Sequence, residues 1–159
     1  MQMGVRENAS LSSLSRIASR GFIRRSHEAE SVGAITGRLH LKSPSLDRPV
    51  SLLSGGNQQK ALLARILMVD PQVLFLDDPA RGIDVGAKED IYRLIDELAA
   101  QGKGIILVSS ELPELFRCTD RILVLSQGRL AALVATRATT PQAIMAAATG
   151  VGAPLEAAS

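Results

Sequence analysis

Residues 53–78 read LSGGNQQKALLARILMVDPQVLFLDD, and this stretch decides the fold of the chain. After the first four residues, apolar side chains recur four positions apart, which predicts an amphipathic helix over 55–69. Pro71 ends that helix. The continuous apolar run at 73–76 then predicts a strand of the kind that parallel sheets bury on both faces. A helix that begins with Ser-Gly-Gly is therefore followed at once by a strand that ends in two aspartates.

Helix and strand patterns alternate on either side of this stretch. Residues 1–41 look helical with short polar interruptions, with Ser26 as the expected N-cap of one helix, and 42–52 contain two prolines and are expected to form a loop. Beyond residue 78 the patterns predict helix 91–98, strand 105–108, helix 113–118, strands 122–125 and 130–135, and helix 141–148. Strands that alternate with helices favour an α/β fold with a parallel sheet.

The composition excludes several classes of protein. Of the 159 residues, 46% are hydrophobic and 21% are charged, which is enough apolar material for a folded core. Aromatic residues make up 3% and the net charge is +2, so a single-stranded nucleic-acid binder is not expected. A lone cysteine, Cys118, excludes an internal disulfide and a cysteine-based zinc cluster. Purely apolar stretches stay far below the ~20 residues of a membrane-spanning helix, and a cytoplasmic protein is expected.

Two features point to chemistry at the ends of these elements. Asp77 and Asp78 follow one predicted strand, Ser109 and Ser110 follow the next, and ligands gather at the carboxyl ends of parallel strands. Ser54 precedes the predicted helix as an N-cap, and the two glycines after it leave the first turn unshielded. The free N–H groups and the positive dipole end of such a turn bind phosphate. Alone, Ser-Gly-Gly before a helix is usually only a cap, and the acidic strand end nearby makes the pattern more specific.

Together these motifs resemble the ATP-binding cassette (ABC) ATPases. Residues 53–60 look like the ABC signature motif, 73–78 like Walker B, 82–84 like the D-loop and 109–112 like the switch region. LSGGNQQK at 53–60, RGIDVGAK at 81–88 and SSELPEL at 109–115 are similar to one branch of the family. That branch is the second cassette of the fused ATPase subunits of ribose-, galactose- and xylose-type sugar importers. The likeness covers nearly the whole chain, about residues 5–150.

This resemblance implies an α/β, partial P-loop NTPase fold, in which a helical N-terminal part precedes a mainly parallel sheet with flanking helices. It implies a helical subdomain at 1–70 that ends in the signature helix, the ATPase core at 71–150 and a C-terminal tail at 151–159. No P-loop of the form G-x-x-x-x-G-K-[ST] occurs in the sequence. We therefore expect the back portion of a cassette, which does not hydrolyse ATP alone and exposes apolar sheet faces to water.

The resemblance also implies roles for single residues. Asp77 would hold Mg²⁺ through water beside the phosphates of ATP. Asp78 stands where the family has a catalytic glutamate, one methylene longer, and Ser110 where many members have a switch histidine. These two and Asp84 of the D-loop form the expected catalytic set, and Asp84 is equally expected to cap the helix that follows. The expected nucleotide-binding set, presented in trans to ATP on a second cassette, is Ser54, Gly55, Gly56, Asn57 and Gln58.

The function implied is the ATP-binding and ATP-hydrolysing component, as a fragment, of a monosaccharide importer at the cytoplasmic face of the inner membrane. The implied cofactors are ATP and Mg²⁺. The implied partners are a second cassette, membrane permease subunits and, indirectly, a periplasmic sugar-binding protein, with no nucleic acid. Two alternatives stay open, a non-enzymatic remnant that only pairs with another cassette and a soluble ABC protein of translation or DNA repair. The motifs at 81–88 and 109–115 argue against the second alternative.

Overall fold

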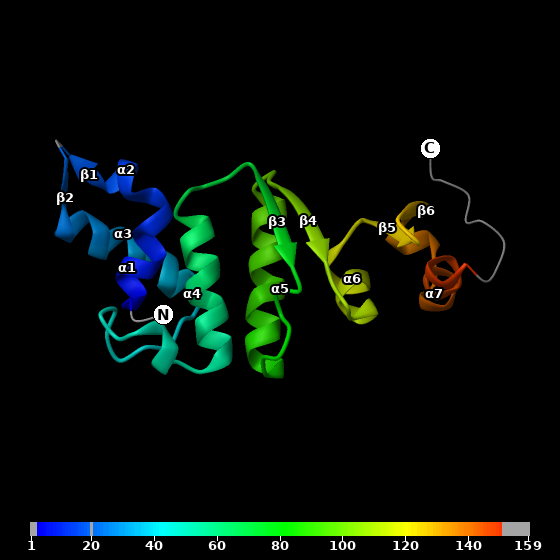
Figure 1. Ribbon diagram of the computed structural model, residues 1–159, viewed down its shortest axis with the longest axis horizontal. Coiled ribbons are helices and arrows are strands. Elements are labelled where there is room, and N and C mark those ends of the chain that lie inside the picture. The colour runs from blue at the N-terminus through cyan, green and yellow to red at the C-terminus, as the bar shows by residue number, and fades with distance from the viewer. Residues whose placement is uncertain (1–2, 20, 151–159) are drawn as a thin grey trace. The chain divides into compact units, whose positions relative to one another are not determined.

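The computed structural model describes residues 3–19 and 21–150, which fall into two compact units, Met1–Ile106 and Leu107–Ser159. We call them unit 1 and unit 2, and Figure 1 labels their elements. The division of the chain into two compact units falls after Ile106. The boundary expected between residues 70 and 71 is one between subdomains implied by the family resemblance, and it stays a prediction. The expected tail at 151–159 lies outside the described residues.

Unit 1 begins with helices. They are α1 (Val5–Ser10), the 3-10 helix η1 (Leu11–Ser13), α2 (Leu14–Ile17), α3 (Arg25–Arg38), the 3-10 helix η2 (Val50–Leu52) and α4 (Gly55–Leu67). α1, α3 and α4 contact one another, and Val5, Val32 and Leu63 on these helices are buried. The buried residues of α4 recur three and four positions apart, which confirms the helix that the sequence predicted. η2 is a short turn of helix within the segment expected to be a loop.

A small hairpin interrupts the helices of unit 1. β1 (Ala18–Ser19) pairs antiparallel with β2 (Phe22–Ile23), and Gly21 between them has a φ of +83°. Because glycine adopts this left-handed conformation without a steric cost, the chain reverses here instead of continuing as a helix. The expectation of helix with polar interruptions over 1–41 is therefore wrong at this hairpin. The expected cap at Ser26 is also wrong, because α3 already begins at Arg25.

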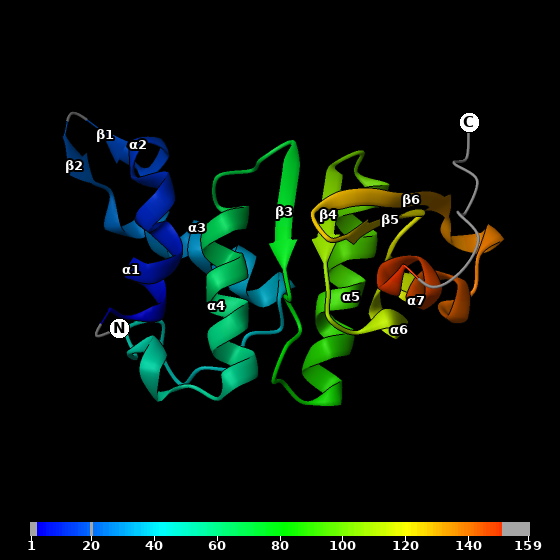
Figure 2. The same cartoon turned by 45° about the vertical axis from the view of Figure 1, so that its right-hand side comes forward.

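β3 (Val73–Asp77) pairs with β4 (Gly104–Val108), and α5 (Val85–Ala100) connects the two strands. Figure 2 shows both arrows pointing the same way, as in a parallel pair joined by a crossover helix. α5 buries an amphipathic face that includes Ile91 and Ile95, and α4 contacts α5. The structure thus confirms the strand-helix-strand unit that the sequence predicted.

The two faces of β3 differ in exposure. Leu74 and Leu76 are 2% and 4% exposed, whereas Val73 and Phe75 are 61% and 64% exposed. The expectation that this strand is buried on both faces is therefore wrong for this chain. The expectation that an apolar face of the sheet meets water is confirmed.

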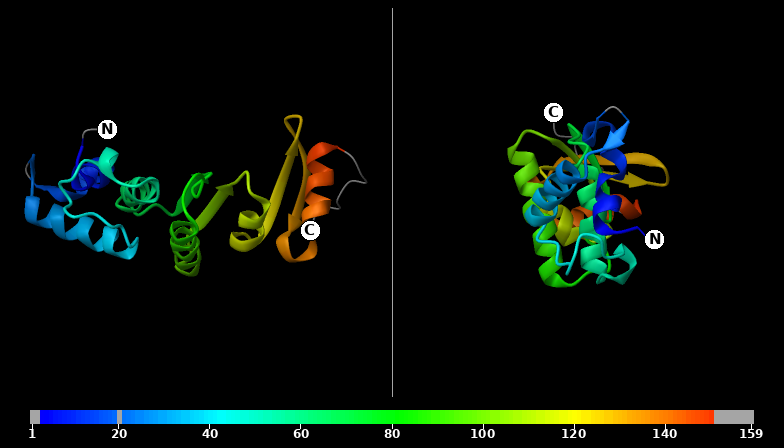
Figure 3. Two further views of the ribbon diagram at one scale, coloured as in Figure 1. Left: turned by 90° about the horizontal axis from the view of Figure 1, so that it is seen from below. Right: turned by 90° about the vertical axis from the view of Figure 1, so that its left-hand side faces the viewer.

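Unit 2 is a hairpin with helices. It contains α6 (Leu112–Cys118), β5 (Arg121–Ser126), β6 (Arg129–Ala135), the 3-10 helix η3 (Thr136–Ala138) and α7 (Pro141–Thr149). β5 and β6 run antiparallel around a turn in which Gln127 and Gly128 both have positive φ, as tight hairpin turns require. α7 packs against this hairpin (Figure 3). The core is formed by Ile122, Val124, Ala132, Val134 and Ile144.

The helices and strands predicted over 113–148 are confirmed, with ends that differ by at most one residue. Across residues 3–19 and 21–150, no helix has both the length and the apolar character needed to cross a membrane.

Candidate functional site

The first turn of α4 begins the candidate site. Ser54 occupies the N-cap position, with φ −62° and ψ 156°, and is exposed. Its position confirms the expected cap, but its side chain makes no capping hydrogen bond to the backbone. Instead, Nδ2 of Asn57 donates to the Ser54 hydroxyl oxygen at 2.9 Å. Since the first N–H groups of a helix have no partner within the helix, a turn that no side chain caps offers them to a ligand.

Glycine at position 56 lets α4 approach the start of α5. Gly56 is buried, and a Cβ atom built on it would lie 2.8 Å from the Cβ of Ala87. Real side chains essentially never come that close. At Gly55 the same test finds only the carbonyl oxygen of Gly82, at 3.9 Å, which is an ordinary contact. The two glycines therefore have different roles, one at a helix contact and the other at an exposed turn.

Asp84 sits directly before α5 and caps it. Its Oδ1 accepts a hydrogen bond from the backbone N–H of Ala87 at 2.9 Å, which confirms the capping role expected from the sequence. Its Oδ2 would lie 3.8 Å from a Cβ on Gly56, so the Asp84 carboxylate lies beside the first turn of α4. Its further role in catalysis stays a prediction.

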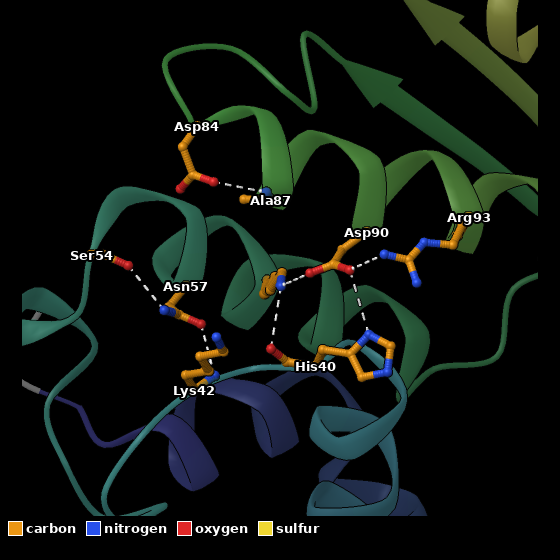
Figure 4. Close-up of polar contacts among 9 residues, drawn as sticks. His40, Lys42, Ser54, Asn57, Asp84, Ala87, Asp90 and Arg93 are labelled. Atoms are coloured by element: carbon orange, nitrogen blue, oxygen red, sulfur yellow. Dashed lines mark hydrogen bonds and ion pairs between the residues drawn. The ribbon is translucent and has the colours of Figure 1, made fainter.

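A polar groove of about 360 Å³ runs between the starts of α4 and α5. Four of the residues expected at the site line it, namely Ser54, Gly56, Asn57 and Asp84, together with Lys42, Lys60, Gly86, Ala87, Asp90 and Arg93. Figure 4 shows Asn57 between Ser54 and the Lys42 segment, with Asp84 at the start of the facing helix. Gln58 points back along the chain instead, where its Nε2 donates to the carbonyl oxygen of Leu53 at 2.9 Å.

A partly buried ion pair lies in the same junction. Lys60 of α4 donates to Oδ2 of Asp90 on α5 at 2.5 Å, and also to the carbonyl oxygen of His40 at 3.2 Å. Asp90 Oδ1 lies 2.7 Å from Nη2 of Arg93 and 3.5 Å from Nδ1 of His40. The hydrogen bond from Lys60 holds the pKa of the Asp90 carboxyl below its ordinary value, and burial opposes this effect.

The local sequence patterns do not predict this cluster as part of the site, although helical spacing contains a signal for it. Lys60 lies four residues after Gly56, so it falls on the buried face of α4, where a lysine needs a partner. That partner lies 30 residues away in the sequence.

The acidic end of β3 differs from the α4–α5 junction. Asp77 is exposed at the last position of the strand. Asp78 follows with a φ of +43°, and its Oδ2 lies 3.7 Å from Nη1 of Arg81. The backbone N–H of Arg81 also donates to the carbonyl oxygen of Asp78 at 3.1 Å, so the chain turns sharply here. The expected metal and catalytic roles of the two aspartates stay predictions.

Ser109 and Ser110 belong to unit 2. The Ser109 hydroxyl donates to the carboxylate of Glu114, which is buried, and its oxygen accepts from the backbone N–H of Glu111 at 3.0 Å. Ser110 is exposed. Ser109 therefore stabilises the start of α6, and the expected meeting of Ser110 with the two aspartates of unit 1 stays a prediction.

The family model for ABC transporters matches residues 1–81, just over half of the chain. The chain therefore belongs to the ABC transporter family. The matched segment includes α4 and β3 and ends directly after the two aspartates and the turn that follows them. The resemblance of residues 53–60 and 73–78 to family motifs thus agrees with the family assignment.

Curated relatives are named as importer subunits. Ribose import ATP-binding protein RbsA 2 of Rubrobacter xylanophilus is 48% identical over 150 residues, which cover 94% of this chain and 29% of the relative. Two proteins of Geobacillus kaustophilus, Ribose import ATP-binding protein RbsA and Xylose import ATP-binding protein XylG, are 45% and 46% identical over 94% of this chain and 30% of their own lengths. The chain thus spans about 30% of the length of the curated relatives it matches.

Solved structures show the same fold. An ATP-binding cassette of an ABC transporter aligns with a TM-score of 0.71 and 24% identity, over 91% of this chain and 58% of that one. A bacterial ABC transporter cassette solved as a dimer aligns with a TM-score of 0.72 and 22% identity, over 85% of this chain and 57% of that one. These similarities confirm the expected α/β fold class, that of ABC cassettes.

Proposed function

We propose that this chain supplies the signature-bearing part of an ATP-binding cassette in a monosaccharide importer. Its first turn of α4 would contact the phosphates of ATP held by a second cassette. The observation that carries this proposal is the exposed N-terminus of α4, where Ser54 makes no backbone cap and Gly55 adds no side chain. Such a turn offers N–H groups and the positive end of the helix dipole to an anion.

The residues present fit both implied cofactors. The phosphate groups of ATP suit a helix start that offers a hydroxyl and uncapped N–H groups, and Asp77 offers Mg²⁺ an exposed carboxylate at the end of β3. When bound, the nucleotide and metal supply the phosphoryl group and the charge that polarises it. In this chain, the first turn of α4 would bind the terminal phosphate, and Asp77 would orient the hydrated metal.

Roles for the other expected residues follow from the same proposal. Asp78 would act as the base that takes a proton from water, and its side chain is one methylene shorter than the glutamate of the family. Ser110 would replace the switch histidine without supplying a positive charge. Asp84 would hold the D-loop conformation against the α4 turn through its cap.

The proposed cargo and partners are supported by the relatives. Relatives named for ribose and xylose import share 45–48% of their matched residues with this chain, which favours a monosaccharide as cargo. A structural neighbour solved as a dimer supports pairing with a second cassette. The proposal further includes permease subunits, an indirect periplasmic sugar-binding protein and a place on the cytoplasmic face of the inner membrane.

A chimera tests the function. The matching 150 residues of the Geobacillus kaustophilus ribose import protein are replaced by those of this chain, and phosphate release from MgATP is measured with the transporter assembled. Ser54→Arg, which places bulk and a long side chain at the α4 turn, is expected to lower turnover by about 100-fold, the scale of losing a key oxyanion contact.

The matched control is Gln101→Arg, which adds the same side chain at an exposed position at the far end of α5. Its turnover is expected to equal that of the unmodified chimera. Equal turnover of the Ser54→Arg and Gln101→Arg chimeras would contradict the proposal. A chimera without ATP turnover would also contradict it, because the chain would then not supply a competent part of a cassette.

A further inference from the structure

Asn57 joins Ser54 to a distant loop through both ends of its side-chain amide. Its Oδ1 accepts a hydrogen bond from the backbone N–H of Lys42 at 2.8 Å, and its Nδ2 donates to the Ser54 hydroxyl oxygen at 2.9 Å. Figure 4 shows the amide between these two partners. The residue lies in the groove between α4 and α5.

The partners of this amide determine which way the Ser54 hydroxyl points. A backbone N–H only donates, so the amide end that faces Lys42 must be the oxygen. The end that faces Ser54 is then the NH₂ group, which only donates, and the Ser54 oxygen must accept. The hydroxyl hydrogen of Ser54 cannot point at Asn57 and is directed elsewhere.

This arrangement differs from an ordinary helix cap. At a usual N-cap the serine oxygen accepts from a backbone N–H of the second or third helical residue. Here the side chain of the third helical residue, Asn57, takes that place, and no backbone cap forms. The backbone N–H groups of the turn and the hydroxyl hydrogen are thereby left for the same ligand.

We propose that Asn57 is a positioning residue that holds the Ser54 hydroxyl as a hydrogen-bond donor toward a phosphate oxygen of the nucleotide. The inference rests on the proposed function, because it assumes that the α4 turn meets ATP. Asn57 acts through Ser54 and is not itself a ligand of the phosphate. Its bond to Lys42 fixes the amide orientation on which the direction of the hydroxyl depends.

A double-mutant cycle in the chimera separates this role from simple support of the loop. Ser54→Ala and Asn57→Ala are each expected to lower the kcat for ATP by about tenfold. The double variant is expected to be no slower than Ser54→Ala, because Asn57 has nothing left to position. The KM for ATP should stay unchanged, since the partner cassette holds the nucleotide before the turn contacts it. The control Gln101→Ala removes an exposed amide elsewhere and should leave kcat unchanged.

A second readout needs no nucleotide. With asparagine labelled with ¹⁵N, the side-chain amide signal of Asn57 is assigned by its loss in Asn57→Ala, and it should shift in Ser54→Ala. If Asn57→Ala does not fold, Asn57→Asp keeps an acceptor for the Lys42 N–H but cannot donate, and its kcat should fall at least as far.

The results distinguish a failure of the role of Asn57 from a failure of the proposed function. Additive losses in the cycle, an unshifted amide signal, or wild-type kcat in Asn57→Asp would overturn the role of Asn57. If Ser54→Arg abolishes turnover while these results appear, only this inference fails. If Ser54→Arg leaves turnover intact, the proposed function fails first.

Discussion

The junction of α4 and α5 and the strand β3 both lie in unit 1, but the surroundings of their side chains differ. In the junction, polar groups are paired within the chain, as with Lys60 and Asp90, and Gly56 removes a side chain where two helices meet. On β3, Val73 and Phe75 present an apolar face to water. The Lys60–Asp90 pair therefore has its partners within the chain, whereas the exposed face of β3 is suited to cover by further protein.

The difference also bears on the two halves of the proposed site. The α4 side holds its functional side chains through hydrogen bonds within the chain, such as the one from the amide of Asn57 to Ser54. The acidic end of β3 offers an exposed Asp77 and a sharp turn at Asp78. We therefore expect substitutions in the junction to act on stability and geometry, and substitutions on the exposed face of β3 to act on association.

The first prediction concerns self-association through the exposed face of β3. Val73→Thr combined with Phe75→Thr removes two large apolar side chains and keeps β-branched residues in the strand. Because exposed apolar patches drive self-association, the double variant should stay monomeric at about tenfold higher concentration than the unmodified chain. Sedimentation velocity measures this.

Leu123→Thr is the matched control, since Leu123 is a similarly exposed apolar residue on a strand of unit 2. If it reduces association as much as the β3 variant does, the face of β3 has no special role. A monodisperse monomer with a sharp, cooperative melt from the unmodified chain would contradict the prediction altogether.

The second effect concerns the partly buried ion pair of the junction. Asp90→Ala leaves Lys60, whose side chain is 6% exposed, with only the carbonyl of His40 among the contacts described, and should cost about 3 kcal/mol. Lys60→Met should cost about 1 kcal/mol, because Asp90 keeps Arg93 and its side chain is 19% exposed. Hydrogen exchange of the α4 and α5 amides in the chimera gives these opening free energies.

The dependence of stability on acidic pH tests the same ion pair. Because the folded pKa of Asp90 lies below its ordinary value, the pair contributes stability above about pH 4 and loses it as the pH falls through the folded pKa. Lys60→Met should flatten this acid dependence. Arg93→Met, which breaks an exposed ion pair to the same carboxylate, should change stability by less than about 0.5 kcal/mol. Equal costs for Asp90→Ala and Arg93→Met would contradict the assignment.

Local patterns predicted most of the fold. The helices α4 and α5 follow from apolar spacing, the strands β5 and β6 from short apolar runs, and the Asp84 cap from its place before a helix. Each of these signals is contained in fewer than about 20 neighbouring residues, where periodicity and turn chemistry are informative. The hairpin β1–β2 was missed because strands of two residues are too short to show a period.

The sequence predicted which residues belong to the candidate site, but not how their side chains are arranged. The motif at 53–60 placed Ser54, Gly56 and Asn57 together, and the structure confirms that they line one groove. It did not indicate that Gln58 turns back to the carbonyl of Leu53, or that Lys60 finds its partner 30 residues away. Those contacts depend on how α4 meets α5, which is a tertiary property that no local pattern contains.

The smallest of the three effects tests that helix contact directly. Gly56→Ala places a Cβ 2.8 Å from that of Ala87, so α4 and α5 must move apart, at a cost of about 1–3 kcal/mol. Gly55→Ala, whose Cβ meets only the Gly82 carbonyl oxygen at 3.9 Å, should be neutral or slightly stabilising. Ala87→Gly should recover most of the loss in the double variant, less the cost of glycine in a helix, about 1 kcal/mol. Hydrogen exchange in the chimera measures all three variants. Equal stability of Gly55→Ala and Gly56→Ala, or no recovery by Ala87→Gly, would show that the close approach of the two helices does not set the geometry of the groove.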